Sequence, residues 1–149
     1  MTIKRILYAS DFSPASRPAF GLGQDLAKAL RAELILFHAV SPIAPMMGEG
    51  YIPTSLMEEM RAQTRRDGER RLEALARTAR RGRIRVSTLL AEGPAAEAIV
   101  KAAKRKRAGL IVIGTRGRTG LARMLLGSVA ERVVRTATCP VLTVGARRA

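Results

Sequence analysis

The chain has 149 residues, a length typical of one domain with a continuous hydrophobic core, so we expect a single domain over residues 1–149. Its single cysteine excludes an internal disulfide. One cysteine and one histidine are also too few soft ligands for a zinc or iron site. The 27 Lys and Arg residues exceed the 12 Asp and Glu residues, and the formal net charge of +15 should attract polyanions such as nucleotides, nucleic acids or anionic lipids.

The first predicted strand covers residues 3–9. The few apolar residues before Ser10 are far short of a signal-peptide core or a membrane span, so we expect a cytoplasmic protein without a membrane partner. A helix should follow directly, because Ser13 can cap its N-terminus and Pro14 fits its first turn. Its apolar residues recur every three or four positions and form one face that should pack on a sheet: Ala15, Ala19, Leu22, Leu26 and Leu30.

Residues 33–40 form the second predicted strand, and their nearly unbroken apolar run is typical of a parallel strand covered on both faces. Residues 41–53 are rich in Pro, Gly and Met and should form a loop, in which Met46 and Met47 suit either a mobile lid or a partner contact. A long helix is then predicted over residues 54–81. The arginine pairs on this helix are typical of a solvated face, and a nucleic-acid patch is the alternative interpretation. Its predicted apolar face consists of Met57, Met60, Thr64, Gly68, Leu72, Leu75 and Ala79.

The rest of the chain continues the alternation of strands and helices. The remaining predicted elements are a strand at 84–91, a helix that opens at Gly93 and Pro94, a strand at 110–113, a helix at 128–137 and a strand at 140–144. The helix after Pro94 has an apolar stripe of Ala95, Ile99 and Ala102, and Pro140 suits a strand start or a sheet edge.

This alternation predicts an α/β fold, an open five-stranded parallel sheet with helices on both faces, because helices of this length serve as crossovers between parallel strands. In such sheets ligands bind outside the carboxyl ends of the strands, where the strand order reverses. The corresponding residues here are 9–11, 38–40, 91–93 and those from Gly114 onward.

A glycine-rich segment follows the fourth strand, where such a fold receives its ligand. Its glycines include Gly114, Gly117 and Gly127, while Arg116 and Arg118 add positive charge. Glycine lets backbone N–H groups approach phosphate oxygens closely, and a helix N-terminus adds a partial positive charge. The sequence contains neither a Walker A motif nor a Gly-x-Gly-x-x-Gly after a strand, so a phosphate site here would use another kind of loop.

The spacing Gly-x2-Gly-x9-Gly-Ser, formed by Gly114, Gly117, Gly127 and Ser128, resembles that of ATP-binding members of the universal stress protein family. The resemblance covers the whole chain, including Ile-Leu-Tyr-Ala-Ser-Asp-Phe-Ser near the start, Leu-Phe-His-Ala-Val in the second strand and Cys-Pro-Val-Leu-Thr-Val near the end. It implies a flavodoxin-like sheet with strand order 3-2-1-4-5, a homodimer through the last strand, and a nucleotide-responsive role in stress or regulation.

By this resemblance, the adenine of ATP would lie near Ala9 and near Ala39 or Val40, and Asp11 would contact the ribose or organise Mg²⁺. Gly117, Gly127 and Ser128 would hold the phosphates. Ala9 departs from the family, whose members often have a larger Val or Pro there. The expected nucleotide-binding set is Ala9, Ser10, Asp11, Ala39, Val40, Gly114, Thr115, Arg116, Gly117, Arg118, Gly127, Ser128 and Val129.

Several of these residues also have structural interpretations. Ser128 and Glu131 fit a capping box, which would satisfy the first N–H groups of the last helix, as well as a phosphate contact. Asp11 suits either a ligand contact or a helix N-terminal charge. For His38, alone at the end of an apolar strand, and for Cys139 we expect structural roles.

Apart from Asp11, no carboxylate or glutamine is placed beside the glycine segment to orient a nucleophile, and Glu92 stands at another strand end. We therefore expect ATP binding with slow or no hydrolysis. A basic nucleic-acid-associated protein is the alternative, although it has few rings for base stacking: Tyr8, Phe12, Phe20, Phe37 and Tyr51. An enzyme that consumes an adenylate is a third possibility, which the lack of an evident base disfavours.

Overall fold

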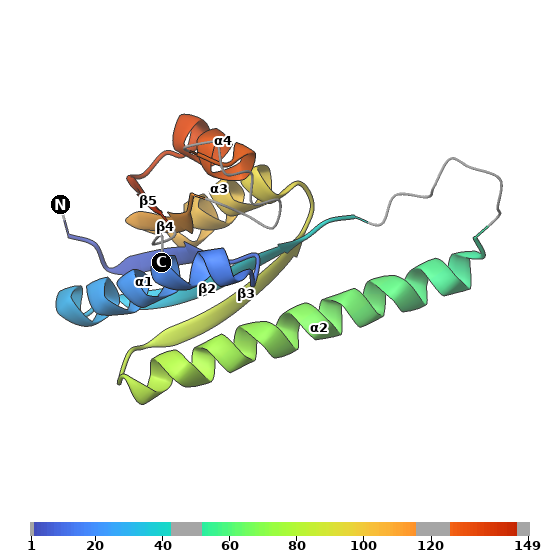
Figure 1. Cartoon of the computed structure of the whole chain (residues 1–149), viewed down its shortest axis with the longest axis horizontal. Helices are drawn as coiled ribbons and strands as arrows, with labels where there is room; N and C mark the ends of the chain where they lie inside the picture. Colours follow the sequence, from blue (N-terminus) through green and yellow to red (C-terminus); the bar gives the residue numbers. More distant parts are fainter. Residues whose placement is uncertain (1, 43–51, 116–125, 146–149) are drawn as a thin grey trace.

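The computed structural model describes residues 2–42, 52–115 and 126–145 and contains a five-stranded parallel sheet between two layers of helices (Figure 1). The strand order β3-β2-β1-β4-β5 confirms the predicted order. The elements are β1 (Arg5–Ala9), the 3-10 turn η1 (Pro14–Ser16), α1 (Arg17–Leu30), β2 (Glu33–Val40), α2 (Thr54–Arg81), β3 (Val86–Glu92), α3 (Ala95–Lys106), β4 (Leu110–Gly114), α4 (Ser128–Thr136) and β5 (Val141–Val144).

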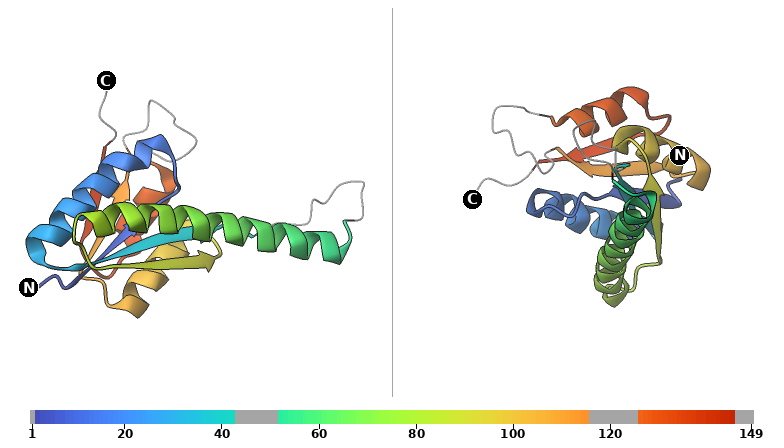
Figure 2. Two further views of the ribbon diagram at one scale, coloured as in Figure 1. Left: turned by 90° about the horizontal axis from the view of Figure 1, so that it is seen from below. Right: turned by 90° about the vertical axis from the view of Figure 1, so that its right-hand side faces the viewer.

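The two faces of the sheet carry separate hydrophobic clusters. Successive residues of a strand point to opposite faces, so on β1 Ile6 and Tyr8 pack with α1 and α2, whereas Leu7 and Ala9 pack with α3 and α4. Figure 2 shows the two pairs of helices on opposite sides of the sheet. Burial of the central strands on both faces explains their continuous apolar sequences.

Helix α2 has the predicted bounds, and α1 begins at Arg17, because the predicted start at Pro14 is a 3-10 turn. The strand bounds agree with the predicted ones to within two residues. The third strand begins at Val86 rather than at residue 84, because Arg83 takes a φ of 59° and pairing with β2 starts at Leu34 and Val86. The first strand begins at Arg5, opposite Glu33, rather than at residue 3. These shifts leave the topology unchanged.

Ser13 is the N-cap residue and Pro14 lies in the first turn, as predicted, but the Ser13 side chain does not form the cap. Ser13 does precede the 3-10 turn, but its side chain makes no capping bond there, and its buried Oγ has no hydrogen-bond partner among the described residues. The Ser13 carbonyl instead accepts hydrogen bonds from the backbone N–H (3.1 Å) and the hydroxyl (2.8 Å) of Ser16. The start of the turn is therefore stabilised by the backbone carbonyl of Ser13, where the sequence predicts a hydrogen bond to its side chain.

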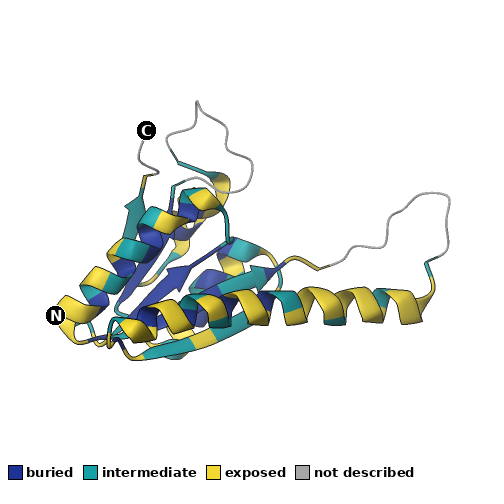
Figure 3. Cartoon of the chain, turned by 60° about the horizontal axis from the view of Figure 1, so that its bottom comes forward, coloured by how far each residue is buried: buried dark blue, intermediate teal, exposed yellow. Residues whose placement is uncertain are grey.

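Helix α2 extends beyond the sheet. Its 28 residues span about 42 Å, whereas the seven residues of β3 beneath it span about 23 Å. Figure 3 shows a mixed buried and exposed surface along the C-terminal half and an almost fully exposed N-terminal half. Leu56 is 46% exposed and Met60 is 44% exposed. The predicted apolar face is therefore wrong at Met60, and it is wrong at Thr64, which is also exposed. The buried residues of α2 are Gly68, Leu72, Ala76 and Ala79.

A glycine sets how closely α2 approaches the sheet. A Cβ atom at Gly68 would lie 2.5 Å from Cδ1 of Leu90 on β3 and 3.4 Å from Cδ2 of His38 on β2. The absence of a side chain therefore lets the helix backbone lie close above the carboxyl ends of these strands. This approach brings α2 to the edge of the cavity described below.

Candidate functional site

The loop that leaves β1 is held in a strained conformation. Phe12 has a φ of 61°, which is unusual for a bulky residue. Its N–H donates to Oγ of Ser10 (3.0 Å), while Oδ1 of Asp11 accepts from the N–H of Ser13 (2.9 Å). These two bonds orient the Ser10 and Asp11 side chains at the carboxyl end of the strand.

The hydroxyl group of Tyr8 anchors the same loop. Its buried hydroxyl donates to the carbonyl of Ser16 (3.0 Å) and lies 3.3 Å from Oγ of Ser10. Burial raises the pKa of Tyr8 above its ordinary value and outweighs the opposing effect of these hydrogen bonds, so the phenol stays protonated and keeps donating at neutral pH. The loop is therefore fixed to both β1 and η1.

His38 has the structural role expected from the sequence. Its Nδ1 lies 2.8 Å from the carbonyl oxygen of Ser10. Because a carbonyl oxygen only accepts, Nδ1 carries the hydrogen and donates this bond. The ring also packs against Phe12, with centroids 4.3 Å apart. His38 thus ties the end of β2 to the loop after β1.

A cavity of about 590 Å³ lies at the carboxyl ends of β1, β2 and β4, beside the start of α4. This is the place where the strand order reverses, and the volume is typical of a small-molecule site. Arg116, Gly117 and Arg118 lie outside the described residues, as do Met46 and Met47. The members of the expected nucleotide-binding set that line the cavity are Ala9, Ser10, Asp11, Ala39, Val40, Gly114, Thr115, Gly127, Ser128 and Val129.

The start of α4 differs from the predicted capping box. Gly127 is the N-cap residue and Ser128 is already inside the helix, where no side-chain capping bond forms. The N–H of Glu131 donates to the carbonyl of Gly127 (2.9 Å), and the Glu131 carboxylate lies 3.7 Å from Nη1 of Arg135. The helix begins at Ser128, as predicted, but because Gly127 takes the N-cap position, Ser128 is the first residue inside the helix and does not act as the cap.

The two ends of the glycine-rich segment meet beside the cavity. The N–H of Gly127 donates to the carbonyl of Thr115 at 2.6 Å, which joins the start of α4 to the end of β4. The N-terminus of α4, with its partial positive charge, is thereby held beside the cavity. The helix N-terminus therefore lies at the carboxyl end of β4, where the sequence predicts a phosphate site.

Among the remaining lining residues, His38 belongs to a strand end where the sequence predicts a ligand, and the others were not assigned to the ligand site from the sequence. Ile99 and Ala95 belong to the apolar stripe of α3, which indicated core packing, and their position at its N-terminal end places them on the cavity. Thr64 comes from α2, where the sequence places it on the apolar face of the helix and not at the ligand site, because its approach to the cavity depends on how that helix packs. The others are Ser16, Phe37, Ser41, Ile113 and Ala130.

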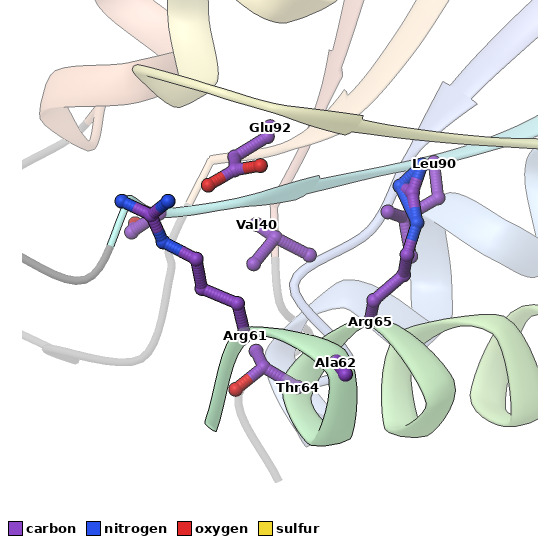
Figure 4. A pocket seen from close by; sticks show the side chains of 8 residues that line it. Val40, Arg61, Ala62, Thr64, Arg65, Leu90 and Glu92 are labelled. Carbon is purple, nitrogen blue, oxygen red and sulfur yellow. The ribbon is translucent and has the colours of Figure 1, made fainter. Parts of the chain in front are cut away.

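Asp11 provides the carboxylate among the described residues that line this cavity. Glu92 instead lines a smaller pocket of about 220 Å³ between α2 and the ends of β2 and β3. Figure 4 shows Arg61 and Arg65 extending from α2 toward the strands that carry Val40 and Glu92. The smaller pocket is below the usual size of a nucleotide site and combines both signs of charge.

Cys139 lies outside the larger cavity and packs, half-buried, against the layer formed by α3 and α4. Burial raises the pKa of its thiol, so the fraction of reactive thiolate at neutral pH is reduced. This agrees with the expected structural role.

Residues 2–42, 52–115 and 126–145 contain no cluster of three or more His, Cys, Asp and Glu side chains arranged to hold a metal ion. Over the same residues, no helix combines the length and apolar character needed to cross a membrane.

Comparison with known proteins gives consistent matches over the full domain. The profile of the universal stress protein family matches residues 2–145. Universal stress protein YxiE of Bacillus subtilis is 36% identical over 144 residues, which cover 94% of this chain and 97% of that protein. The solved structure of protein MJ0577 of Methanocaldococcus jannaschii has a TM-score of 0.84 and 25% identity, with 100% of both chains covered. A universal stress protein solved in complex with cAMP has a TM-score of 0.65 and 26% identity, covering 99% of this chain and 100% of its own.

Proposed function

The chain belongs to the universal stress protein family, and we propose that it binds ATP in the cavity at the carboxyl ends of β1, β2 and β4. The observation that carries this proposal is the joining of the Gly127 N-cap to the end of β4, which places a helix N-terminus at one side of an otherwise largely apolar cavity. A similar protein of the family was solved with cAMP, which is also an adenine nucleotide. In this proposal the bound nucleotide changes dimer shape or partner choice in a regulatory or stress response.

The adenine would bind at the apolar side of the cavity. Ala9 and Val40 are buried strand-end residues, and Ala39, which precedes Val40 in β2, also lines the cavity. Small side chains at Ala9 and Ala39 leave room for a planar ring, while Ile99 and Ile113 extend the apolar wall. Apolar burial would provide most of the binding free energy at this end.

The phosphates would bind at the N-terminus of α4. Gly127 has a φ of −70° and a ψ of 156°, an extended conformation that any residue adopts, so its backbone conformation does not require glycine. A close approach of phosphate to the backbone does explain a residue without a side chain at this position. Ser128, exposed in the first turn, would add a hydroxyl donor.

Asp11 would face the ribose or the metal. Mg²⁺ keeps several water ligands and is usually held by one or two carboxylates together with substrate phosphates, so a single carboxylate in a phosphate-binding cavity fits this ion. The bond from the Ser13 N–H fixes the orientation of the Asp11 side chain. When bound, Mg²⁺ would neutralise part of the triphosphate charge.

We propose at most slow hydrolysis of the bound ATP. Fast phosphoryl transfer needs positioned metal ligands together with a residue that orients the attacking water. Among the described residues that line the cavity, Asp11 is the one with a carboxylate side chain. The His38 ring packs against Phe12 and is hydrogen-bonded to the Ser10 carbonyl. These residues support binding and orientation more than the activation of water.

The test is calorimetric titration with Mg·ATP, repeated at raised salt and with Mg·GTP. We expect one saturable ATP site per chain that survives moderate salt, because apolar adenine contacts are insensitive to ionic screening. Weaker binding of GTP is expected if the base lies in a shaped apolar slot. No heat with ATP under either salt condition would contradict the proposal.

We further propose a homodimer through β5, as the family resemblance implies. The strand order places Val141–Val144 at the edge of the sheet, where it pairs with β4 on one side. Edge strands offer backbone groups to a second chain, and Val129 and Val134 on α4 are 38% and 47% exposed. Light scattering should give about twice the chain mass of 16.1 kDa, and a monomer mass at all concentrations would contradict the dimer.

A further inference from the structure

The ends of three helices lie together at the amino ends of the strands, on the side of the sheet opposite the cavity. Because all strands are parallel, α1, α2 and α3 end where β1, β2, β3 and β4 begin. Figures 1 and 2 both show α1 and α2 ending on the side where β3 starts. Residues from four separate stretches of sequence therefore form one end of the molecule.

This end is strongly basic. Residues 4–5, 28–31, 80–85 and 104–107, here called the basic pole, contain no acidic residue. Two nearby carboxylates are already bonded: Glu33 accepts a hydrogen bond from Oγ of Ser87 at 2.6 Å, and Glu73 accepts one from Arg80 at 2.6 Å. The cations of the basic pole are Lys4, Arg5, Lys28, Arg31, Arg80, Arg81, Arg83, Arg85, Lys104, Arg105, Lys106 and Arg107.

Three of these arginines occupy positions where glycine is more stable. Arg31, Arg83 and Arg107 have φ values of 53°, 59° and 51°, in the left-handed region that follows a helix C-terminus. Glycine is the usual residue there because it has no Cβ atom to clash with the backbone. After α2 the chain does contain Gly82, but its φ is −78°, and the next residue, Arg83, takes the left-handed conformation. Arginine therefore occupies three positions whose backbone conformation its side chain does not favour.

Structural roles explain only some of the pole's cations. Arg5 donates to the carbonyl of Lys106, and Arg85 donates to the carbonyl of Arg31 at 3.0 Å, so both hold neighbouring helix ends. Cations in the last turns of α2 and α3 also interact favourably with the helix dipoles. Neither role requires arginine in the left-handed positions, and the side chains there are exposed.

We propose that the basic pole binds the phosphodiester backbone of double-helical nucleic acid. Guanidinium groups match phosphate oxygens in two-pronged hydrogen bonds. A membrane anchor would combine such charges with apolar side chains, but among the described residues of the pole Leu30 is the one large exposed hydrophobic. A site for single-stranded nucleic acid would need exposed aromatic side chains to stack on the bases, whereas Tyr8, Phe20 and Phe37 are buried.

The test measures binding of a short labelled DNA duplex by fluorescence anisotropy over a series of salt concentrations. The logarithm of the affinity should fall linearly with the logarithm of salt concentration, because phosphate contacts release counterions. The variant Arg31→Gly/Arg83→Gly/Arg107→Gly should bind at least about tenfold more weakly and reduce the slope by about 2 to 3. Its melting temperature should be unchanged or higher, because glycine suits these conformations, so loss of binding will not reflect unfolding.

The matched control is Arg66→Gln/Arg70→Gln/Arg132→Gln, which removes the same charge from exposed arginines that bond to Gln63, Asp67 and Glu97. It should change duplex affinity by less than about threefold, since these sites lie away from the pole. Equal losses in both variants would mean that only net charge matters and would overturn the proposal. Absence of duplex binding, or tighter binding to phosphatidylserine vesicles than to duplex, would overturn it as well.

Discussion

Gly127→Val should abolish measurable ATP binding while leaving the fold intact. The valine side chain would occupy the space at the N-terminus of α4 where we place the phosphates, and both the N–H groups and the cavity mouth would be blocked. We expect the dissociation constant in calorimetry to rise about 100-fold or more. Because the φ of −70° is open to valine, the far-UV circular dichroism should remain that of the wild type.

Two further variants make this result specific. Gly127→Ala adds one methyl group and should give an intermediate affinity. Gly21→Val places the same side chain on α1, where a Cβ meets no atom within 4 Å, and should leave ATP binding unchanged. Normal affinity in Gly127→Val would show that the phosphates bind elsewhere, and equal losses in both valine variants would point to a general loss of stability.

Of the variants proposed here, Leu72→Ala should lose the most stability, with the free energy of unfolding lowered by about 2 to 5 kcal/mol. Leu72 is 1% exposed and is packed in the cluster between α2 and the sheet, where truncation leaves a cavity. Urea denaturation followed by circular dichroism measures the change. Leu72 does not line the ATP cavity, so affinity measured well below the denaturation midpoint should be retained.

Leu56→Ala is the matched control because it makes the same substitution in the same helix at a 46% exposed position. It should change the free energy of unfolding by less than about 0.5 kcal/mol. If both variants lost similar stability, the N-terminal half of α2 would have to be packed in solution, in contrast to its exposed state here.

The proposed ATP cavity lies at the carboxyl ends of the strands, and the basic pole lies at their amino ends. Both positions follow from the same topology. At the carboxyl edge, strands lead into helix N-termini, whose positive dipole ends favour anions. At the amino edge, helix C-termini meet the strand starts, and their negative dipole ends favour the many cations found there. A polyanion on the basic pole would therefore leave the proposed ATP cavity open.

The sequence by itself determined the class of the fold and most of its elements. Apolar runs such as residues 33–40 have no alternation, which is the pattern of strands buried on both faces, and the intervening helices require parallel pairing. The strand order followed from the family resemblance, because hydrophobic periodicity within one element carries no information about its neighbours in space. The clustering of Ala9, Asp11, Gly114 and Gly127 could be expected, since strand ends and the following helix starts share one edge.

Only the tertiary structure decided features that depend on the distance between elements. Met60 has the correct helical spacing for the apolar face but lies beyond the end of the sheet, and Thr64 reaches the cavity because Gly68 lets α2 approach. Ser128 lost its predicted capping role to a shift of one residue, which local pattern cannot resolve because either residue is an acceptable N-cap. The basic pole joins arginines more than twenty residues apart, each of which looks like ordinary solvated charge in the sequence. Secondary structure is encoded by neighbours along the chain, whereas these contacts depend on how far each element extends and which others meet it there.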